Sequence, residues 1–171
     1  MIIAGLTAYA ESLDKTTPVI PVYVEIDVDE QHCLAQNIYF EAGNQSLEGM
    51  AAVADVTLNR VQNSRYPNTI CDVVKQGLKH PNGMMKRNMC QFSWYCDGRV
   101  DTPNEGRTWR SAQELAKKVL VNHYDKALID ITDGATHYHA NWMEKYPKWS
   151  KKKKIMASID RHIFYGSRKT L

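Results

Sequence analysis

The 171-residue sequence lacks the features that mark several large classes of protein. It has no run of 18 apolar residues, so no segment is expected to insert stably in a membrane. It has no Gly-x-Ser-x-Gly, no Gly-rich phosphate loop and no His-Glu-x-x-His, so the chemistries that depend on these motifs are weakly supported. The mildly apolar first 12 residues are not preceded by a basic residue, so no secretory signal peptide is predicted.

Cysteine is also scarce. The four cysteines are too few for a disulfide scaffold, and four cysteines allow three pairings. Cys90 and Cys96 enclose five residues and could close a small loop. The positions 33, 71, 90 and 96 contain no Cys-x2-Cys pair and match no common structural zinc pattern. We therefore expect disulfides or buried thiols, no metal site and no cofactor.

Charge is distributed unevenly along the chain, although the net charge is only +3. Residues 11–30 carry six acidic residues against one lysine, whereas residues 142–171 carry nine lysines or arginines against two acidic residues. A basic C-terminal region indicates an anionic partner, which could be nucleic acid, a membrane surface or a bacterial wall polymer. The alternative for the lysine run at 151–154 is an ordinary solvated surface.

The periodicity predicts one mainly helical α+β domain over residues 29–171, preceded by an extension or arm over residues 1–28. The extension is Pro-interrupted and β-branched, which favours extended backbone. Apolar spacing predicts helices, and short aromatic runs predict a small antiparallel element. The expected helices cover 29–42, 47–62, 70–78 and 104–124, a loop covers 77–89, and the strands fall within 134–142 and 161–166.

Glu41 is the most informative single residue. Leu34, Ile38 and Glu41 follow the spacing i, i+4 and i+7, which puts a carboxylate on an apolar helix stripe that ends near Gly43. The negative end of the helix dipole and the apolar neighbours would both raise its pKa, as a general acid requires. Spacing alone favours the simpler alternative, a rim glutamate paired with an arginine such as Arg60.

Two aromatic segments are further candidates. In "CQFSW", the side chains of Gln91 and Ser93 offer hydrogen bonds beside the rings of Phe92 and Trp94, a combination that suits a sugar-binding groove but also an ordinary packed loop. In "HYH", two histidines at positions 137 and 139 lie on one face of the expected strand. They could bind zinc, but a hydrogen-bonded core or groove histidine is favoured because no further ligands are evident in the sequence.

Taken in order, "CLAQNIYFEAGNQSLEGMAAVADVTLNRV", "YPNTICDVVKQG", "CQFSWYCDG", "GATHYHA" and "HIFYG" resemble the SleB-type cell wall hydrolase family, which includes spore cortex-lytic enzymes and bacteriophage endolysins. The resemblance covers residues 30–166. It implies a lysozyme-like fold, akin to that of lytic transglycosylases, and an enzyme that cleaves peptidoglycan. Glu41 would be the catalytic acid, and the groove would be lined by Gln91, Phe92, Ser93, Trp94, Tyr138 and His139.

The chain departs from the family pattern at two positions near the catalytic motif. The family commonly has Arg after "EA", where this chain has Gly43, and Gln in "EGQ", where this chain has Met50. Glu41 itself is retained, so these departures bear on the groove or its packing.

The number of acids favours one reaction over another. Ordinary glycosidases use two carboxylates. Here Glu48 is surrounded by a turn and is expected to face solvent, and Asp55 lies off the apolar stripe. With one convincing acid, a lytic transglycosylase acting between MurNAc and GlcNAc is the first prediction, and a hydrolytic muramidase is its alternative. Less favoured are a zinc amidase using His137, His139 and Cys96 or His162, and a non-catalytic wall-binding module.

The resemblance also sets expectations about partners and place of action. The expected partner is the glycan strand of peptidoglycan. The protein is expected to be a monomer that does not bind nucleic acid and does not insert stably in a membrane. The protein would act on the bacterial wall, in the periplasm or outside the cell. Without a signal peptide, it would be released from the host cytoplasm as an endolysin or carried by a virion.

Overall fold

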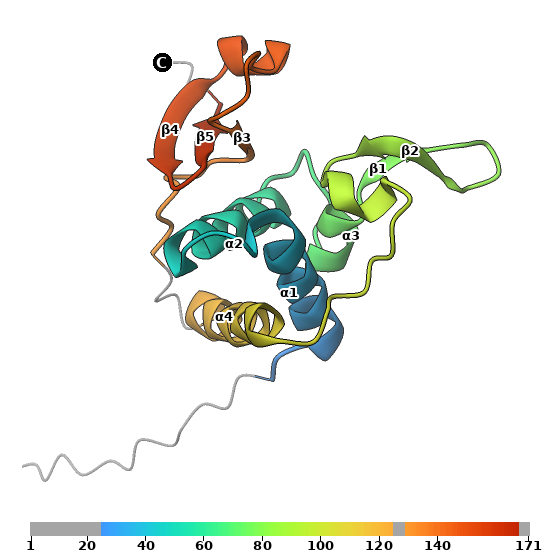
Figure 1. Cartoon of the computed structure of the whole chain (residues 1–171), viewed down its shortest axis with the longest axis vertical. Helices are drawn as coiled ribbons and strands as arrows, with labels where there is room; N and C mark the ends of the chain where they lie inside the picture. The colour runs from blue at the N-terminus through green and yellow to red at the C-terminus, as the bar shows by residue number, and fades with distance from the viewer. Residues whose placement is uncertain (1–24, 125–128, 168–171) are drawn as a thin grey trace, which may run out of the picture.

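The computed structural model describes residues 25–124 and 129–167, and its helices pack together with a three-stranded sheet at one end and a hairpin at the side (Figure 1). This arrangement confirms the predicted mainly helical α+β class. In chain order the elements are α1 Val28–Ala42, α2 Leu47–Val61, α3 Ile70–Val74, β1 Gly77–Lys79, β2 Met85–Cys90, the 3-10 helix η1 Ser93–Cys96, α4 Arg107–Tyr124, β3 His137–Ala140, the 3-10 helix η2 Lys148–Lys152, β4 Lys154–Ile159 and β5 His162–Gly166.

Helix α1 begins slightly earlier than the sequence predicts. The side chain of Asp27 caps it by accepting hydrogen bonds from the backbone N–H groups of Asp29 and Glu30. Ile26 already packs against the core. The expected boundary between residues 28 and 29 therefore falls inside a helix, because the cap lies on the N-terminal side of it. Most of the predicted arm, residues 1–24, lies outside the described residues.

Helix α2 is buried on two sides, whereas its periodicity predicts one apolar face. The predicted stripe, which includes Val53 and Leu58, packs with α1, α3 and α4 in the main core. A second set, Ala52 and Val56, packs against Phe164 of the sheet. Because the other helices cover one side of α2 and the sheet covers another, the polar residues of α2 between the two stripes are also buried.

The segment predicted as the loop 77–89 forms the hairpin of β1 and β2, so that prediction was wrong. Its residues lack a buried alternating face, and most of the hairpin is exposed, which is why hydrophobic periodicity did not indicate strands. The helix predicted over 70–78 is correspondingly shorter and ends at Val74. The backbone N–H of Gln91 donates to the carbonyl of Gln76 (2.8 Å) and joins the hairpin to the helical part.

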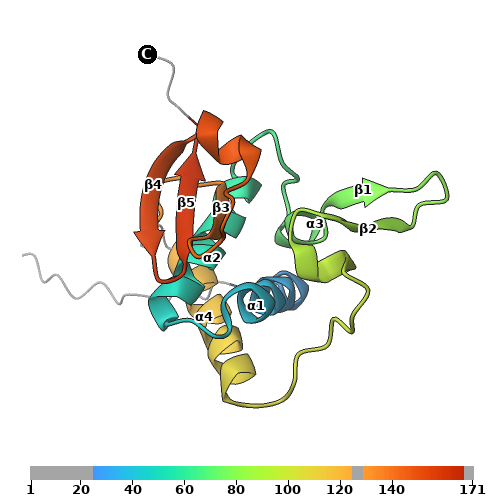
Figure 2. The ribbon, with the colours of Figure 1, turned by 45° about the horizontal axis from the view of Figure 1, so that its top comes forward.

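The late sheet has the antiparallel order β3-β5-β4, and its three strands lie side by side over α2 (Figure 2). His137 pairs with Tyr165, and Lys154 pairs with Gly166. The two aromatic strands were predicted, but β4 was not, because it begins in the lysine run and alternates only weakly. Tyr138 points to the α2 side of the sheet, so its neighbours His137 and His139 lie on the opposite face, as predicted.

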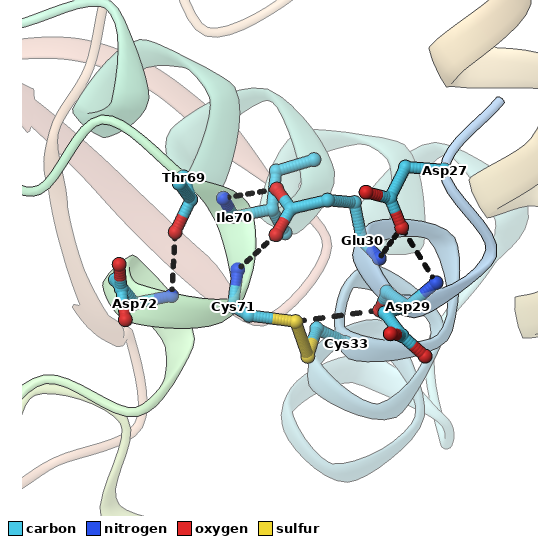
Figure 3. Close-up of a disulfide and its surroundings, with 8 residues drawn as sticks. All are labelled: Asp27, Asp29, Glu30, Cys33, Thr69, Ile70, Cys71 and Asp72. Carbon is cyan, nitrogen blue, oxygen red and sulfur yellow. Dashed lines mark hydrogen bonds between the residues drawn. A yellow bond between two sulfur atoms is a disulfide. The ribbon is translucent and has the colours of Figure 1, made fainter.

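All four cysteines are in disulfides, Cys33–Cys71 and Cys90–Cys96, so the small loop considered from the sequence is closed. The first disulfide joins α1 to α3 (Figure 3). Beside it, the Glu30 carboxylate accepts hydrogen bonds from the backbone N–H groups of Ile70 (2.5 Å) and Cys71 (3.3 Å). This carboxylate and the disulfide together fix the short helix α3 against α1.

Candidate active site

A groove of about 460 Å³ lies between the C-terminal end of α1, the start of η1 and the segment from β3 to η2. Residues from five separated parts of the chain line it: Glu41, Arg60, Gln91, Ser93, Tyr138, His139, Ala140, Trp142, Met143, Pro147, Trp149 and His162. Five of the seven site residues predicted from the sequence are therefore brought to one groove, and Glu41 is the sole carboxylate among the described residues that line it.

Glu41 lies one residue before the end of α1, where Leu34 and Ile38 of the same stripe are fully buried. Its carboxylate reaches the groove at the point where the sheet approaches the helices. The hydroxyl of Tyr138 donates to Oε2 of Glu41 at 2.8 Å. Burial raises the pKa of the Glu41 carboxyl, and the hydrogen bond from Tyr138 and the charge of Arg60 oppose that rise only in part.

The second oxygen of this carboxyl, Oε1, has no hydrogen-bond partner among the described residues. Because Oε2 already accepts from a hydroxyl, the carboxyl proton is better placed on Oε1. The geometry therefore leaves Oε1 open to carry the carboxyl proton in the groove and holds the other oxygen in place.

Arg60 lies close to this carboxyl without forming an ion pair with it. No carboxylate oxygen of Glu41 lies within 4.0 Å of a side-chain nitrogen of Arg60, so the rim salt bridge that spacing alone favours is absent. The guanidinium is buried; its Nε donates to the Thr136 carbonyl at 2.9 Å, and its carbon lies 4.6 Å from the centre of the Phe92 ring. Its Nη1 has no partner in the described structure. Arg60 thus supplies a fixed positive charge beside Glu41.

The four predicted residues of "CQFSW" separate into two pairs. Gln91 and Ser93 are exposed and line the groove. Phe92 and Trp94 lie in the core instead of along the groove: Trp94 stacks on Phe40 with ring centres 4.5 Å apart. The backbone is extended at Phe92 and enters the 3-10 helix η1 at Ser93, and along this stretch exposed and buried side chains alternate.

Tyr138 and His139 both line the groove, but each is already hydrogen-bonded within the protein. Tyr138 holds Glu41, and burial raises the pKa of its hydroxyl, so it remains a donor. The two ring nitrogens of His139 are paired with the Tyr165 hydroxyl (2.9 Å) and the Ala140 carbonyl (3.0 Å). His139 therefore shapes the wall of the groove and has no free ring nitrogen to offer a ligand.

Sequence reasoning missed several groove residues, chiefly Trp142 and Trp149, and considered Arg60 only as an ion-pair partner for Glu41. Trp142 is 72% exposed although it is a large apolar residue, and exposed tryptophans in a groove are typical of sugar-binding surfaces. The signal available in the sequence was its place two residues after "HYHA". The burial of Arg60 leaves no signal in the sequence, because it depends on the sheet packing against α2.

The two other acids that the sequence brings into question do not line the groove. Glu48 is exposed in the first turn of α2, as predicted. Asp55 is buried and accepts a hydrogen bond from the backbone N–H of Ile131 at 2.9 Å. Neither carboxylate is therefore placed as a partner for Glu41.

The residues considered for zinc are held in other interactions. The Cys96 sulfur is in a disulfide, and Nδ1 of His162 is 3.0 Å from the side-chain nitrogen of Gln45. In the described parts of the chain, no group of three or more His, Cys, Asp or Glu side chains is arranged to hold a metal ion. Over the same residues, no helix is long and apolar enough to cross a membrane.

The fold is similar to two solved catalytic domains. The catalytic domain of the germination-specific lytic transglycosylase SleB from Bacillus anthracis is 24% identical, with a TM-score of 0.60, and the alignment covers 85% of this chain and 100% of that one. The catalytic domain of the Bacillus cereus SleB protein is 21% identical, with a TM-score of 0.56, covering 85% and 95%. These likenesses establish the lysozyme-like α+β fold.

No curated protein sequence is similar enough to the chain to count as a match. The model of the cell wall hydrolase family matches residues 44–165. The match begins three residues after Glu41 and includes every other residue that lines the groove. Because it covers well over half of the sequence, the chain belongs to the cell wall hydrolase family.

Proposed function

We propose that the protein is a lytic transglycosylase that cleaves the β-1,4 bond between MurNAc and GlcNAc in peptidoglycan, with Glu41 as both acid and base. The observation that carries the proposal is the single carboxylate in the described lining of the groove. Retaining and inverting glycosidases each need a second carboxylate. The activity named for the similar Bacillus anthracis domain supports the same reaction.

The reaction needs one group that first gives and then takes a proton. Glu41 Oε1 donates its proton to the glycosidic oxygen as the bond from the MurNAc C1 to that oxygen breaks. The resulting Glu41 carboxylate accepts the proton of the MurNAc 6-hydroxyl while the 6-oxygen bonds to C1. A 1,6-anhydro end and a GlcNAc 4-hydroxyl result, no water is consumed, and Glu41 is protonated again.

The surroundings of Glu41 suit both halves of this cycle. Burial keeps the carboxyl protonated before the reaction, as an acid must be. Tyr138 and the charge of Arg60 favour the carboxylate that forms after the first step. Tyr138 also fixes Oε2, which leaves Oε1 directed to the substrate.

The remaining groove residues would hold the strand. Trp142 and Trp149 offer apolar faces for sugar rings, and Gln91 and Ser93 offer polar groups on the opposite wall. Tyr138 and His139 would contribute through the shape they give to the wall. Phe92 and Trp94 would act only through packing, because they are buried in the core.

The test is mass spectrometry of muropeptides released from purified peptidoglycan by the wild type, by Glu41→Gln and by Glu48→Gln. We expect 1,6-anhydro ends from the wild type and from Glu48→Gln, and none from Glu41→Gln. Reducing ends from the wild type would replace this proposal with hydrolysis by a muramidase.

The other two classes predict different results. A zinc amidase would release peptides and lose activity with a chelator. A wall-binding module would release nothing and would bind equally well after Glu41→Gln. Either result would contradict the proposal.

Assembly and place of action are further parts of the proposal. Because one chain supplies every lining residue of the groove, we expect a monomer that acts on peptidoglycan and does not bind nucleic acid. Light scattering with and without glycan strands tests the first expectation, and a nucleic-acid shift assay tests the second. The family resemblance supports an endolysin or virion-borne role; presence in purified particles would favour the virion.

The catalytic domain is proposed to extend to the end of the chain from the cap of α1, with the preceding residues as an extension. A chain that begins at residue 25 should then keep its activity on purified peptidoglycan. Loss of activity with retained helicity would overturn this division.

A further inference from the structure

Two cationic side chains meet at the end of the sheet where β5 finishes. Arg65, in the connection between α2 and α3, donates from Nη2 to Oγ of Ser167 at 2.8 Å. Lys154 pairs with Gly166, and Lys153 directly precedes Lys154 at this end of the sheet, where the charge of Arg65 acts on it. In Figure 2, the connection after α2 rises beside the sheet. Residues far apart in the sequence are thus gathered around one strand end.

His137 completes this group from the other side of β5. It opens β3 and pairs with Tyr165. Its Nδ1 is 2.9 Å from the hydroxyl of Thr136, whereas Nε2 has no partner among the described residues. Burial and three neighbouring cations lower the pKa of His137 to about 4, so the ring is neutral at pH 7 and Nε2 can donate a hydrogen bond. We call Arg65, Lys153 and His137 the basic cluster.

No acid balances the basic cluster. The partners of Arg65 are the neutral side chains of Ser167 and Asn63. Over residues 25–124 and 129–167, no carboxylate lies within 4.0 Å of Arg65 or Lys153. Burial and the charge of Arg65 lower the pKa of Lys153. Holding like charges together without a counter-ion costs free energy, which a bound anion would offset.

The basic cluster adjoins the groove through Trp149. The Trp149 ring lines the groove and lies 5.2 Å from the ring of His137, centre to centre. Arg60 also belongs to the groove lining, and its charge acts on His137. An anion bound at the cluster would therefore sit beside whatever fills the groove. A ligand attached to the same strand would reach both sites at once.

We propose that Arg65, Lys153 and His137 bind a carboxylate of the stem peptide carried by the glycan strand in the groove. The inference rests on the proposed function, because that function places the strand there. The Arg65 guanidinium can donate two parallel hydrogen bonds to one carboxylate, Lys153 adds a point charge, and Nε2 of His137 adds a neutral donor. The stem peptide begins at the lactyl group of MurNAc. Its carboxylates are therefore present near every cleavable bond whose MurNAc still carries a peptide.

The experiment compares Arg65→Met, Lys153→Met and the double variant with the wild type on three substrates. These are glycan strands with intact stem peptides, the same strands with their carboxylates amidated, and strands stripped of peptide. For intact strands, we expect each single variant to lose about tenfold in kcat/KM, the effect of roughly one charge-assisted hydrogen bond. Amidated and stripped strands should be cleaved equally by all proteins. Lys117→Met, which removes an exposed charge from α4, is the matched control and should resemble the wild type on every substrate.

Three results would overturn the inference. An equal loss on all three substrates would indicate a structural role, and circular dichroism melting would then show the variants to be destabilised. No loss on any substrate would show that the cluster does not bind the strand. If a glycerol-phosphate polymer inhibited the wild type but not the double variant, and amidation had no effect, the ligand would be a phosphate polymer. If the wild type released no anhydro ends, the proposed function itself would fail.

Discussion

The two walls of the groove are held in place by different forces. The wall that carries Glu41 belongs to a helical unit packed around an apolar core and fastened by the Cys33–Cys71 disulfide. The wall that carries Tyr138 and the tryptophans belongs to the chain after residue 128. Its apolar contact with α2 is a smaller cluster of Ala52, Val56, Ala135 and Phe164.

Hydrogen bonds also hold the second wall, the one that carries Tyr138, against α2. Asp55, Asn59 and Arg60 on α2 all bond to the segment 130–136 that leads into β3; we call these three residues the polar seam. Asn59 alone contacts the Asp130 carboxylate, the Thr132 hydroxyl and the Ala135 carbonyl. The candidate acid therefore sits on the wall fixed by packing, and its hydrogen-bond donor sits on the wall fixed by polar groups.

The largest expected effect is on the chemical step and not on the packing of either wall. Glu41→Gln should lower kcat by about a thousandfold, as the loss of a general acid does, because glutamine keeps the shape but has no transferable proton. The melting temperature should change little, since the oxygen of the new amide can still accept from Tyr138. Turbidity loss of purified peptidoglycan and a thermal melt measure the two quantities. Glu48→Gln is the control; a melting temperature lowered as much as activity would contradict this separation.

The next effect concerns the helical wall alone. For the Cys33–Cys71 disulfide, which spans 38 residues, removal should cost about 4 kcal/mol of unfolding free energy. The Cys90–Cys96 disulfide spans six residues, and its removal should cost only about 2 kcal/mol. Alanine pairs at each site, melted by calorimetry, test the order, and the first pair should lower the melting temperature by roughly 10 °C. The reverse order would mean that α3 is fixed mainly by Glu30.

The same contrast explains what the sequence could predict. Helices α1 and α2 were predicted because each has an apolar stripe, and the position of Glu41 followed from the stripe of α1. Strand β4 and the hairpin of β1 and β2 were not predicted, because their exposed residues show no regular alternation of apolar and polar side chains. The burial of Arg60 and Asp55 could not be predicted either: it arises only when the sheet packs on the second side of α2. Phe92 and Trp94 carried the right chemistry for sugars, but local backbone geometry turned both rings into the core.

The third effect is a pH dependence of the second wall. Burial raises the pKa of Asp55 to about 7, and the nearby Asp130 carboxylate adds to the rise. An ordinary aspartate in the unfolded chain has a pKa of about 3.9. Between this pKa and that of folded Asp55, the folded state therefore binds a proton that the unfolded state does not. Stability from this group is therefore complete below pH ~4 and is lost as the pH rises through about 7.

The substitution Asp55→Asn tests the direction of this pH dependence of stability. Asparagine can still accept from the Ile131 N–H and does not titrate. Between pH 5 and pH 8, the wild type should lose on the order of 2 kcal/mol of unfolding free energy that the variant keeps. Urea unfolding at the two pH values measures the difference. Asp133→Asn removes an exposed carboxylate from the same loop and should leave the wild-type slope; an equal slope in Asp55→Asn would place the titration elsewhere.

A smaller effect should appear where the two walls touch. Tyr138→Phe removes the hydrogen bond to Oε2 of Glu41, which should lower kcat about tenfold because Oε1 is no longer held toward the substrate. It should also raise the pKa of Glu41 further, since that hydrogen bond opposes the rise caused by burial. The high-pH limb of the activity profile would then move to higher pH. Tyr146→Phe, at an exposed tyrosine bonded to the Asn141 carbonyl, should change neither quantity.

The smallest effect belongs to the rim of the second wall, where Trp142 is exposed beside the groove. Trp142→Ala removes an aromatic face without touching Glu41, Tyr138 or the polar seam, so it should weaken binding and leave the chemical step intact. We expect KM to rise roughly threefold with kcat unchanged, the size of one aromatic contact. Val100→Ala, at an apolar residue of similar exposure outside the groove, should leave KM as it is. A fall in kcat with unchanged KM would instead mean that Trp142 orders the wall that carries Tyr138, and the rim would then belong to the same unit as the donor to Glu41.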